Sequence, residues 1–253
     1  AYDRSSMPPR HPGGVKIVIL LTFGTRPEWI KIKPLVEVFK KNGHSFKVLF
    51  TGQHTTLLPA EANLSIDLVA EIRGDGNRLD SIVSSLMNLS HVWMHDFSHV
   101  LVQGDTTSAF SLAIAAFHRK IPVIHLEAGL RTYDMNNPYP EEFNRQAISR
   151  AASIHFCPTT IAADNLKNEG IHNNVFITGN TVLDNLTETA PSETNIVPIT
   201  MHRRENHDIM HLWFEEFEKL AQKHRDLKFI FPMHPNPKVQ KHKQLLKYVE
   251  VIK

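Results

Sequence analysis

The chain has 253 residues, of which 42% are hydrophobic and 21% charged, as is ordinary for a folded protein with one large domain or two modest ones. Its net charge of +2 lacks the basic excess of a dedicated nucleic-acid-binding protein, so no nucleic-acid partner is expected. The single cysteine, Cys157, excludes an intramolecular disulfide and a multi-cysteine metal site. A lone cysteine also fits a reducing compartment, so a cytoplasmic location is expected.

The first segments predict half of a βαβ unit. Residues 1–14 are polar and rich in proline and glycine, and we expect them to be a disordered leader or an expression remnant. The aliphatic run over 15–23 predicts a strand buried on both faces. This run is much shorter than the ~20 residues that cross a bilayer, so no membrane segment is expected. From Pro27 onward, apolar residues at helical spacing predict a helix that ends at the glycine of KKNGH.

The same alternation of strand and helix continues along the chain. Further strands are predicted at FKVLF (46–50), HVLVQ (99–103), IPVIHLE (121–127), SIHFC (153–157) and NVFITGN (174–180). Helices are predicted around 79–86 and 109–116, and over 141–152 and 159–170. This order predicts an α/β doubly wound sheet with helices on both faces.

A polar stretch containing proline, 187–195, predicts a linker between a Rossmann-like domain over 15–186 and a partial one over 196–253. The second set has strands at IVPIT, LKFIF and YVEVI and a helix that contains Leu212, Trp213, Phe217 and Leu220. Pro198 would remove a hydrogen bond from a central strand. Because nothing would cover the last strand, we expect the second domain to be incomplete and the chain to be truncated or shortened.

Polar residues concentrate at the predicted carboxyl ends of the strands, where open parallel α/β sheets bind their ligands. In chain order they are Arg26, Glu28, Lys31, Gln53, His54, Asp105, Thr106, Glu127, Arg131, Glu141, Glu142, Asn144, Arg145, Asn180, His202, Arg203, Arg204, Glu205, Asn206 and His234. Basic side chains and helix N-termini suit a phosphate group, and carboxylates suit proton transfer. The pattern therefore predicts a site that makes or breaks a bond to a phosphate leaving group while moving protons.

Several of these motifs also have a purely structural interpretation. GTRPE could be only a helix start in which Glu28 complements the helix dipole, and GDTTS is a good N-cap sequence. Glu127 leaves a buried strand, so it is expected to be paired or to have a raised pKa. His91, His95 and His99 have the spacing of one helical face, but the dipole at a helix C-terminus favours histidines without a metal, and no metal is expected.

In this order, the motifs FGTRPEWIK, TGQH, QGDTTSA, HLEAGLRTYDMNNPYPEEFNRQAIS, TGNTVLDNL, MHRREN and PMHPNP closely resemble those of the non-hydrolysing UDP-N-acetylglucosamine 2-epimerases. The resemblance implies two Rossmann-like domains in a GT-B-like arrangement, a homodimer, and a UDP-sugar substrate, with no nicotinamide or metal cofactor. It implies inversion at C2 of a UDP-linked 2-acetamido sugar, in which UDP leaves by anti elimination and then adds back. Asp105, Glu127 and Glu141 would be the acid/base carboxylates, and His202 would lie near the departing diphosphate.

The resemblance also implies that Arg26 and Lys31 bind the nucleotide sugar and that Glu142 and Arg145 support the carboxylates. The full set of expected substrate-binding residues is Arg26, Lys31, Gln53, His54, Arg145, Asn180, Arg203, Glu205 and His234. The Ser-Gly-Gly segment with which the family holds UDP does not occur in the sequence, so an inactive nucleotide-sugar-binding remnant is an alternative. A hydrolysing 2-epimerase that releases UDP and N-acetylmannosamine is a second alternative.

Overall fold

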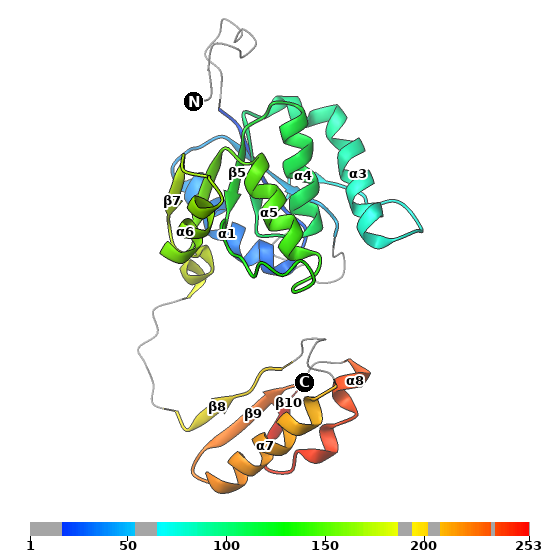
Figure 1. Ribbon diagram of the computed structural model, residues 1–253, viewed down its shortest axis with the longest axis vertical. Helices are drawn as coiled ribbons and strands as arrows, with labels where there is room; N and C mark the ends of the chain where they lie inside the picture. The colour runs from blue at the N-terminus through cyan, green and yellow to red at the C-terminus, as the bar shows by residue number, and fades with distance from the viewer. Residues whose placement is uncertain (1–16, 54–64, 187–193, 202–207, 234–235, 253) are drawn as a thin grey trace, which may run out of the picture. The chain divides into compact units, whose positions relative to one another are not determined.

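The computed structural model describes residues 17–53, 65–186, 194–201, 208–233 and 236–252, with the backbone alone for 89–93. The chain divides into two compact units, one ending at Thr187 and the other beginning at Glu188 (Figure 1). The predicted leader (1–14) and most of the predicted linker (187–195) lie outside the described residues. Within the described ranges, no helix combines the length and the apolar character needed to cross a bilayer.

The first unit is built on a parallel sheet of seven strands in the order β3-β2-β1-β4-β5-β6-β7. The strands are β1 (Ile19–Phe23), β2 (Phe46–Phe50), β3 (Leu68–Val69), β4 (His99–Gln103), β5 (Val123–Leu126), β6 (Ile154–Cys157) and β7 (Val175–Ile177). The predicted α/β fold class is confirmed. Strand β3 was not predicted, because two residues are too few to show a periodic pattern.

Helices cover both faces of this sheet. They are α1 (Arg26–Lys41), α3 (Arg78–Trp93), α4 (Thr107–His118), α5 (Glu141–Ala151) and α6 (Thr160–Asn168), with the short 3₁₀ helices η2 (Met94–Asp96) and η3 (Thr181–Asn185). Helices α3, α4 and α5 lie side by side on one face (Figure 1). Leu20 of β1 packs in their core cluster, whereas the next residue, Leu21, packs with Trp29 and Ile32 of α1. This division follows from the alternation of side chains along a strand.

The carboxyl ends of these parallel strands lie at one edge of the sheet. The strand order reverses between β1 and β4, and open α/β sheets bind ligands in the crevice at such a reversal. The loops there pack closely, since a Cβ on Gly24 would overlap the hydroxyl groups of Thr51 and Ser108. Glycine at this position therefore lets the loop after β1 approach β2 and α4.

A small apolar cluster under α6 contains the cysteine of the chain. Cys157 is fully buried and packs with Ala128, Ala162 and Leu166. Burial raises the pKa of its thiol to about 11, although the positive charge of a nearby arginine opposes the rise. Gly129, next to this cluster, has a φ of +86°, and a Cβ there would overlap the backbone carbonyl of Ala162. The turn after β5 therefore requires glycine at residue 129.

The second unit contains, among the described residues, a parallel sheet of three strands in the order β10-β9-β8. Its elements are β8 (Ile196–Pro198), α7 (Met210–Lys223), β9 (Lys228–Pro232), α8 (Pro237–Gln240), η5 (Lys243–Leu245) and β10 (Glu250–Ile252). From its place in the sequence, Pro198 was expected to remove a hydrogen bond from a central strand. In the described sheet β8 is an edge strand, and an edge is where a β-sheet tolerates proline.

The helix predicted in this unit is confirmed as α7, but three of the four apolar residues named for it are largely exposed. Leu212, Trp213 and Leu220 expose 52%, 46% and 46% of their surface, whereas Met210 and Phe214 are fully buried. The helix carries apolar residues on more than one side, so their spacing alone does not determine which side is buried.

Candidate active site

The structure brings five of the predicted site residues together at the ends of β4 and β5. Asp105 follows β4, and Glu127 follows the adjacent strand β5. Lys31 reaches them from α1, Arg145 from α5, and Asn180 from the loop between β7 and η3. The predicted site residues His54, His202, Arg203, Glu205 and His234 lie outside the described residues.

Glu127 is bound by three side chains. Its Oε2 forms an ion pair with Lys31 and accepts a hydrogen bond from Nε2 of Gln103, a residue that sequence analysis did not select. Its Oε1 accepts a hydrogen bond from Nδ2 of Asn180 at 2.8 Å. The φ of Glu127 is +65°, a left-handed conformation that is costly for a residue with a side chain and is found preferentially at functional sites. Of the two outcomes expected from the sequence, the structure shows pairing.

Asp105 has a different environment. Its Oδ2 lies 2.6 Å from Nη2 of Arg145, and its backbone carbonyl accepts a hydrogen bond from Nδ2 of Asn144 at 2.9 Å. Burial raises the pKa of Asp105, the charge of Arg145 opposes the rise, and the negative charges of Glu141 and Glu127 add to it. A carboxyl group with a raised pKa is suited to exchanging a proton with a substrate near neutral pH.

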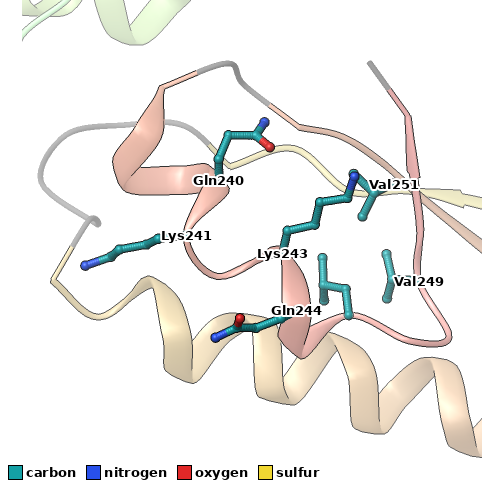
Figure 2. A pocket seen from close by; sticks show the side chains of 7 residues that line it. Gln240, Lys241, Lys243, Gln244, Val249 and Val251 are labelled. Carbon is teal, nitrogen blue, oxygen red and sulfur yellow. The ribbon is translucent and has the colours of Figure 1, made fainter.

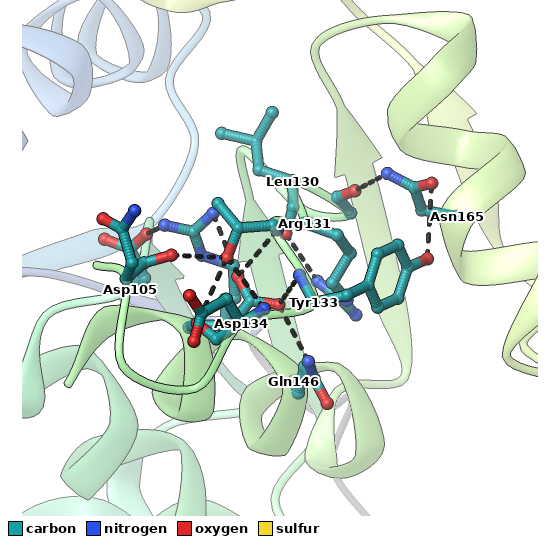
Figure 3. Close-up of polar contacts among 12 residues, drawn as sticks. Asp105, Leu130, Arg131, Tyr133, Asp134, Gln146 and Asn165 are labelled. Carbon is teal, nitrogen blue, oxygen red and sulfur yellow. Dashed lines mark hydrogen bonds and ion pairs between the residues drawn. The ribbon is translucent and has the colours of Figure 1, made fainter. Parts of the chain in front are cut away.

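Glu142 anchors Arg145 and the loop before α5. Figure 3 shows the surrounding network of polar contacts, in which Asp105, Tyr133 and Gln146 are labelled. The side chain of Glu142 is fully buried, and its Oε2 lies 3.4 Å from Nη1 of Arg145. The carboxylate also accepts hydrogen bonds from the amides of Thr132 and Tyr133 at 3.0 Å and from Nε2 of Gln146 at 2.8 Å. Burial alone would raise the pKa of Glu142, but these hydrogen bonds outweigh it and lower the pKa. Glu142 is therefore a structural anion that holds the guanidinium of Arg145 in place.

Glu28 joins the loops after β1 and β4. It is 3% exposed, and its Oε2 accepts a hydrogen bond from the amide of Gly24 at 3.0 Å. Its Oε1 accepts a hydrogen bond at 2.8 Å from the hydroxyl of Thr106, which is the N-cap of α4. Burial raises the pKa of Glu28, although these hydrogen bonds oppose the rise. The structural role expected for Glu28 from the sequence was only to complement the helix dipole. Its contact with Thr106 could not be predicted, because Thr106 lies 78 residues further along the chain.

Gln53 and Arg26, both predicted to bind substrate, differ in their contacts. Oε1 of Gln53 accepts a hydrogen bond from the amide of Ser108 at 3.0 Å, so this side chain holds the N-terminus of α4. Arg26 is exposed at the first position of α1, and within the described structure its guanidinium has no hydrogen-bond or ion-pair partner. An exposed guanidinium beside a helix N-terminus is a suitable ligand for a phosphate group.

His125, inside β5, supports the turn that precedes Asp105. The ring is fully buried, and its Nε2 donates a hydrogen bond to the carbonyl of Gly104 at 2.8 Å. Gly104 has a φ of +69°, so the bond fixes a left-handed turn. Burial lowers the pKa of His125 to about 3 and that of its neighbour His155 to about 4, so both rings are neutral near pH ~7. His125 begins the HLEAGLRT motif, but nothing in the sequence indicates that its ring contacts Gly104, 21 residues earlier.

A surface depression of about 700 Å³ lies in the second unit (Figure 2). It is lined by Gln240, Lys241, Lys243, Gln244, Leu246, Val249 and Val251, and so by none of the predicted site residues. His95 lies in η2 and His99 in β4, so these two do not share a helix face. Among the described residues, no three side chains of histidine, cysteine, aspartate or glutamate are grouped so that they could hold a metal ion.

Known proteins of one family match this chain over most of its length. The family model for UDP-N-acetylglucosamine 2-epimerase matches residues 37–252. The UDP-N-acetylglucosamine 2-epimerase of Campylobacter jejuni is 39% identical over 90% of this chain and 68% of its own length. The corresponding protein of Salmonella borreze is 35% identical over 88% of this chain and 66% of its own length.

A solved structure gives the same result. The crystal structure of UDP-GlcNAc 2-epimerase from Neisseria meningitidis bound to UDP-GlcNAc has a TM-score of 0.81 and 35% sequence identity, and the match covers 94% of this chain and 72% of that one. This chain spans about two thirds of the length of the curated relatives that it matches. The extent of the family match and the identities to these relatives show that the chain belongs to the UDP-N-acetylglucosamine 2-epimerase family.

Proposed function

We propose that this chain catalyses epimerisation at C2 of a UDP-2-acetamido sugar, interconverting UDP-N-acetylglucosamine and UDP-N-acetylmannosamine or modified analogues. Membership of the family supports the proposal. The observation that carries it is the pair of carboxylates with contrasting environments at the ends of adjacent strands: Asp105 beside Arg145, and Glu127 beside Lys31. Inversion at C2 needs one group that takes a proton and another that returns it, and two carboxyl groups in different environments suit these roles. Nearby cations suit a diphosphate leaving group.

The proposed reaction is elimination of UDP followed by its re-addition. A base removes the proton from C2, the electron pair of that C–H bond forms a double bond between C1 and C2, and UDP leaves with the electrons of the C1–O bond. UDP then returns to C1 while a proton is delivered to the opposite face of C2. The overall change consumes no oxidant, reductant or water.

The residues take the following roles in this proposal. Asp105, Glu127 and Glu141 supply the acid/base groups, and the raised pKa of Asp105 supports its part in proton exchange. Arg26 binds the nucleotide sugar, as its exposed position at a helix N-terminus suggests. Lys31 also serves this binding while it fixes the carboxylate of Glu127. His202, outside the described residues, is proposed to lie near the departing diphosphate.

A proton NMR time course of the chain with UDP-N-acetylglucosamine in deuterated water tests the reaction. We expect exchange of the C2 proton and appearance of the manno epimer, without free sugar. Equal amounts of UDP and free N-acetylmannosamine would instead identify a hydrolysing enzyme. A folded sample that shows neither exchange nor epimer contradicts the proposal for this chain.

Two isosteric variants test the assigned roles. Asp105→Asn and Glu127→Gln are each expected to lower kcat by at least ~100-fold, because each removes a titrating group with little change in volume. Asp164→Asn, at an exposed carboxylate on α6, is the control and should retain wild-type activity. Circular dichroism checks that each variant is folded, and near-normal turnover in either site variant contradicts the role assigned to that residue.

A homodimer is also proposed, on the basis of the family resemblance. Light scattering after size-exclusion chromatography separates this state from a monomer of 28.8 kDa.

A further inference from the structure

Helix α1 contains a proline in its interior, Pro34. Proline has no amide N–H, so the carbonyl of Ile30, four residues earlier, lacks the hydrogen bond that a helix normally supplies. A carbonyl without a partner is unfavourable wherever water does not reach it freely. In this chain the partner comes from a distant segment.

Helix η3 supplies that partner. Nδ2 of Asn185 donates a hydrogen bond to the carbonyl of Ile30 at 2.7 Å. The hydroxyl of Thr181 donates to the carbonyl of the next residue, Lys31, also at 2.7 Å. Two side chains of η3 therefore fasten it to the turn of α1 that carries Lys31.

The same two elements hold the two oxygens of Glu127. Lys31 of α1 pairs with Oε2, and Asn180, the N-cap of η3, donates to Oε1 at 2.8 Å. Both polar atoms of the Asn180 carboxamide are hydrogen-bonded, since its Oδ1 accepts a hydrogen bond from the amide of Val182 at 3.0 Å. A closed ring of contacts thus runs from α1 through η3 to Glu127 and back to α1.

We propose that Thr181 and Asn185 are positioning residues for Glu127, because they fasten η3 to α1 and so set the spacing between Lys31 and Asn180. The inference rests on the acid/base role proposed for Glu127. Neither residue bonds to Glu127, so their effect passes through the two residues that do. A displaced carboxylate impairs proton transfer. Substrate binding is expected to change less, because Arg26, which is also proposed to bind the nucleotide sugar, forms no hydrogen bond with η3 in the described structure.

The first test compares Thr181→Val with Thr181→Ser. Valine keeps the shape of threonine without its hydroxyl, whereas serine keeps the hydroxyl. Thr181→Val and Asn185→Ala are each expected to lower kcat about tenfold and to change KM less than about twofold, while Thr181→Ser keeps wild-type values. Asn173→Ala, at an exposed asparagine in the loop before β7, is the matched control and should be unchanged. Equal kcat values for the two Thr181 variants, or an effect on KM alone, overturn the proposal.

The second test uses Pro34→Ala, which restores an amide donor to the carbonyl of Ile30. Asn185→Ala is expected to lower the Tm clearly less in the Pro34→Ala background than in the wild-type background. Additive losses of Tm overturn the proposed fastening. This double-mutant comparison uses Tm alone and needs no enzymatic activity, so it distinguishes failure of the proposed function from failure of the proposed fastening. A wild-type chain that does not exchange the C2 proton overturns the proposed function and with it the role at Glu127, whereas the Tm values alone decide whether η3 is fastened to α1.

Discussion

Acid is expected to destabilise the first unit through two buried histidines, His125 and His155. Burial lowers their pKa values from 6.5 to about 3 and about 4. Unfolded histidines gain a proton near pH ~6.5, whereas the folded ones do so only at much lower pH. The free energy of unfolding is therefore unaffected by these rings above the unfolded pKa, and it decreases as the pH falls toward the folded pKa values. His125→Gln is the informative change, because glutamine can still donate to the carbonyl of Gly104 but does not titrate.

The magnitude follows from proton linkage. At about pH 5, each unfolded histidine carries nearly one proton and each folded one almost none, so each costs about 2 kcal/mol of stability relative to about pH 8. Because this pH lies above both folded pKa values, the cost depends mainly on the unfolded pKa. Wild type is expected to lose about 4 kcal/mol from the two rings, His125→Gln about 2, and His125→Gln with His155→Gln none from this source.

Urea unfolding at the two pH values measures these differences. Trp29 is 2% exposed in the core of the first unit, so its fluorescence reports unfolding there. A Trp213→Phe background removes the signal of the second unit from wild type and variants alike. The reasoning is refuted if wild type and His125→Gln lose the same free energy of unfolding between the two pH values.

Three further changes test the backbone, a buried carboxyl and the electrostatics of the site. Gly129→Ala is expected to lower the free energy of unfolding by about 2 to 4 kcal/mol, because its Cβ would overlap a backbone carbonyl. Gly170→Ala is the control: its φ is +81° but the space around it is open, so the expected loss is only about 1 kcal/mol. Denaturant titrations showing equal losses would contradict this difference. Glu28 has a raised pKa, so its contribution to stability is present below its ordinary pKa of 4.5 and is lost as the pH rises through the folded value. Glu28→Gln should therefore be most destabilising in acid, and a penalty that grows with pH in urea titrations would contradict this sign. Arg145→Gln removes the positive charge that lowers the pKa of Asp105, so this pKa should rise further. The acid limb of the pH profile of kcat/KM should therefore move to higher pH, and an unmoved limb would exclude Asp105 as its source.

The strands and the edge that carries the site could be predicted because buried parallel strands are nearly continuous aliphatic runs. Asp105 and Glu127 directly follow two such runs, and parallel topology places their strand ends at the same edge. The partners of these carboxylates could not be predicted. Lys31 lies on a helix whose rotation is set by packing, and Asn180 lies 53 residues beyond Glu127.

Other features depended on contacts between segments that are distant in sequence. Pro34 is a local signal of a freed carbonyl, but nothing in the sequence connects it with Asn185, whose acceptor Ile30 is 155 residues away. Glu28 is a second example. A glutamate that only begins a helix cannot be distinguished in sequence from one whose carboxylate hydrogen-bonds to two loops. Trp213 illustrates a different difficulty. This large apolar residue lies on an exposed side of α7, because the helix packs against the core of its unit through another side.

The buried thiol of Cys157 can report local opening of the folded protein. Thiol reagents attack the thiolate, and in the folded chain Cys157 is protected both by its inaccessibility and by a pKa raised to about 11. Because the sequence has one cysteine, any labelling under native conditions reports an event that exposes the cluster under α6. The labelling rate therefore measures the free energy of that opening without an engineered probe, and it reports on the first unit while the second remains attached.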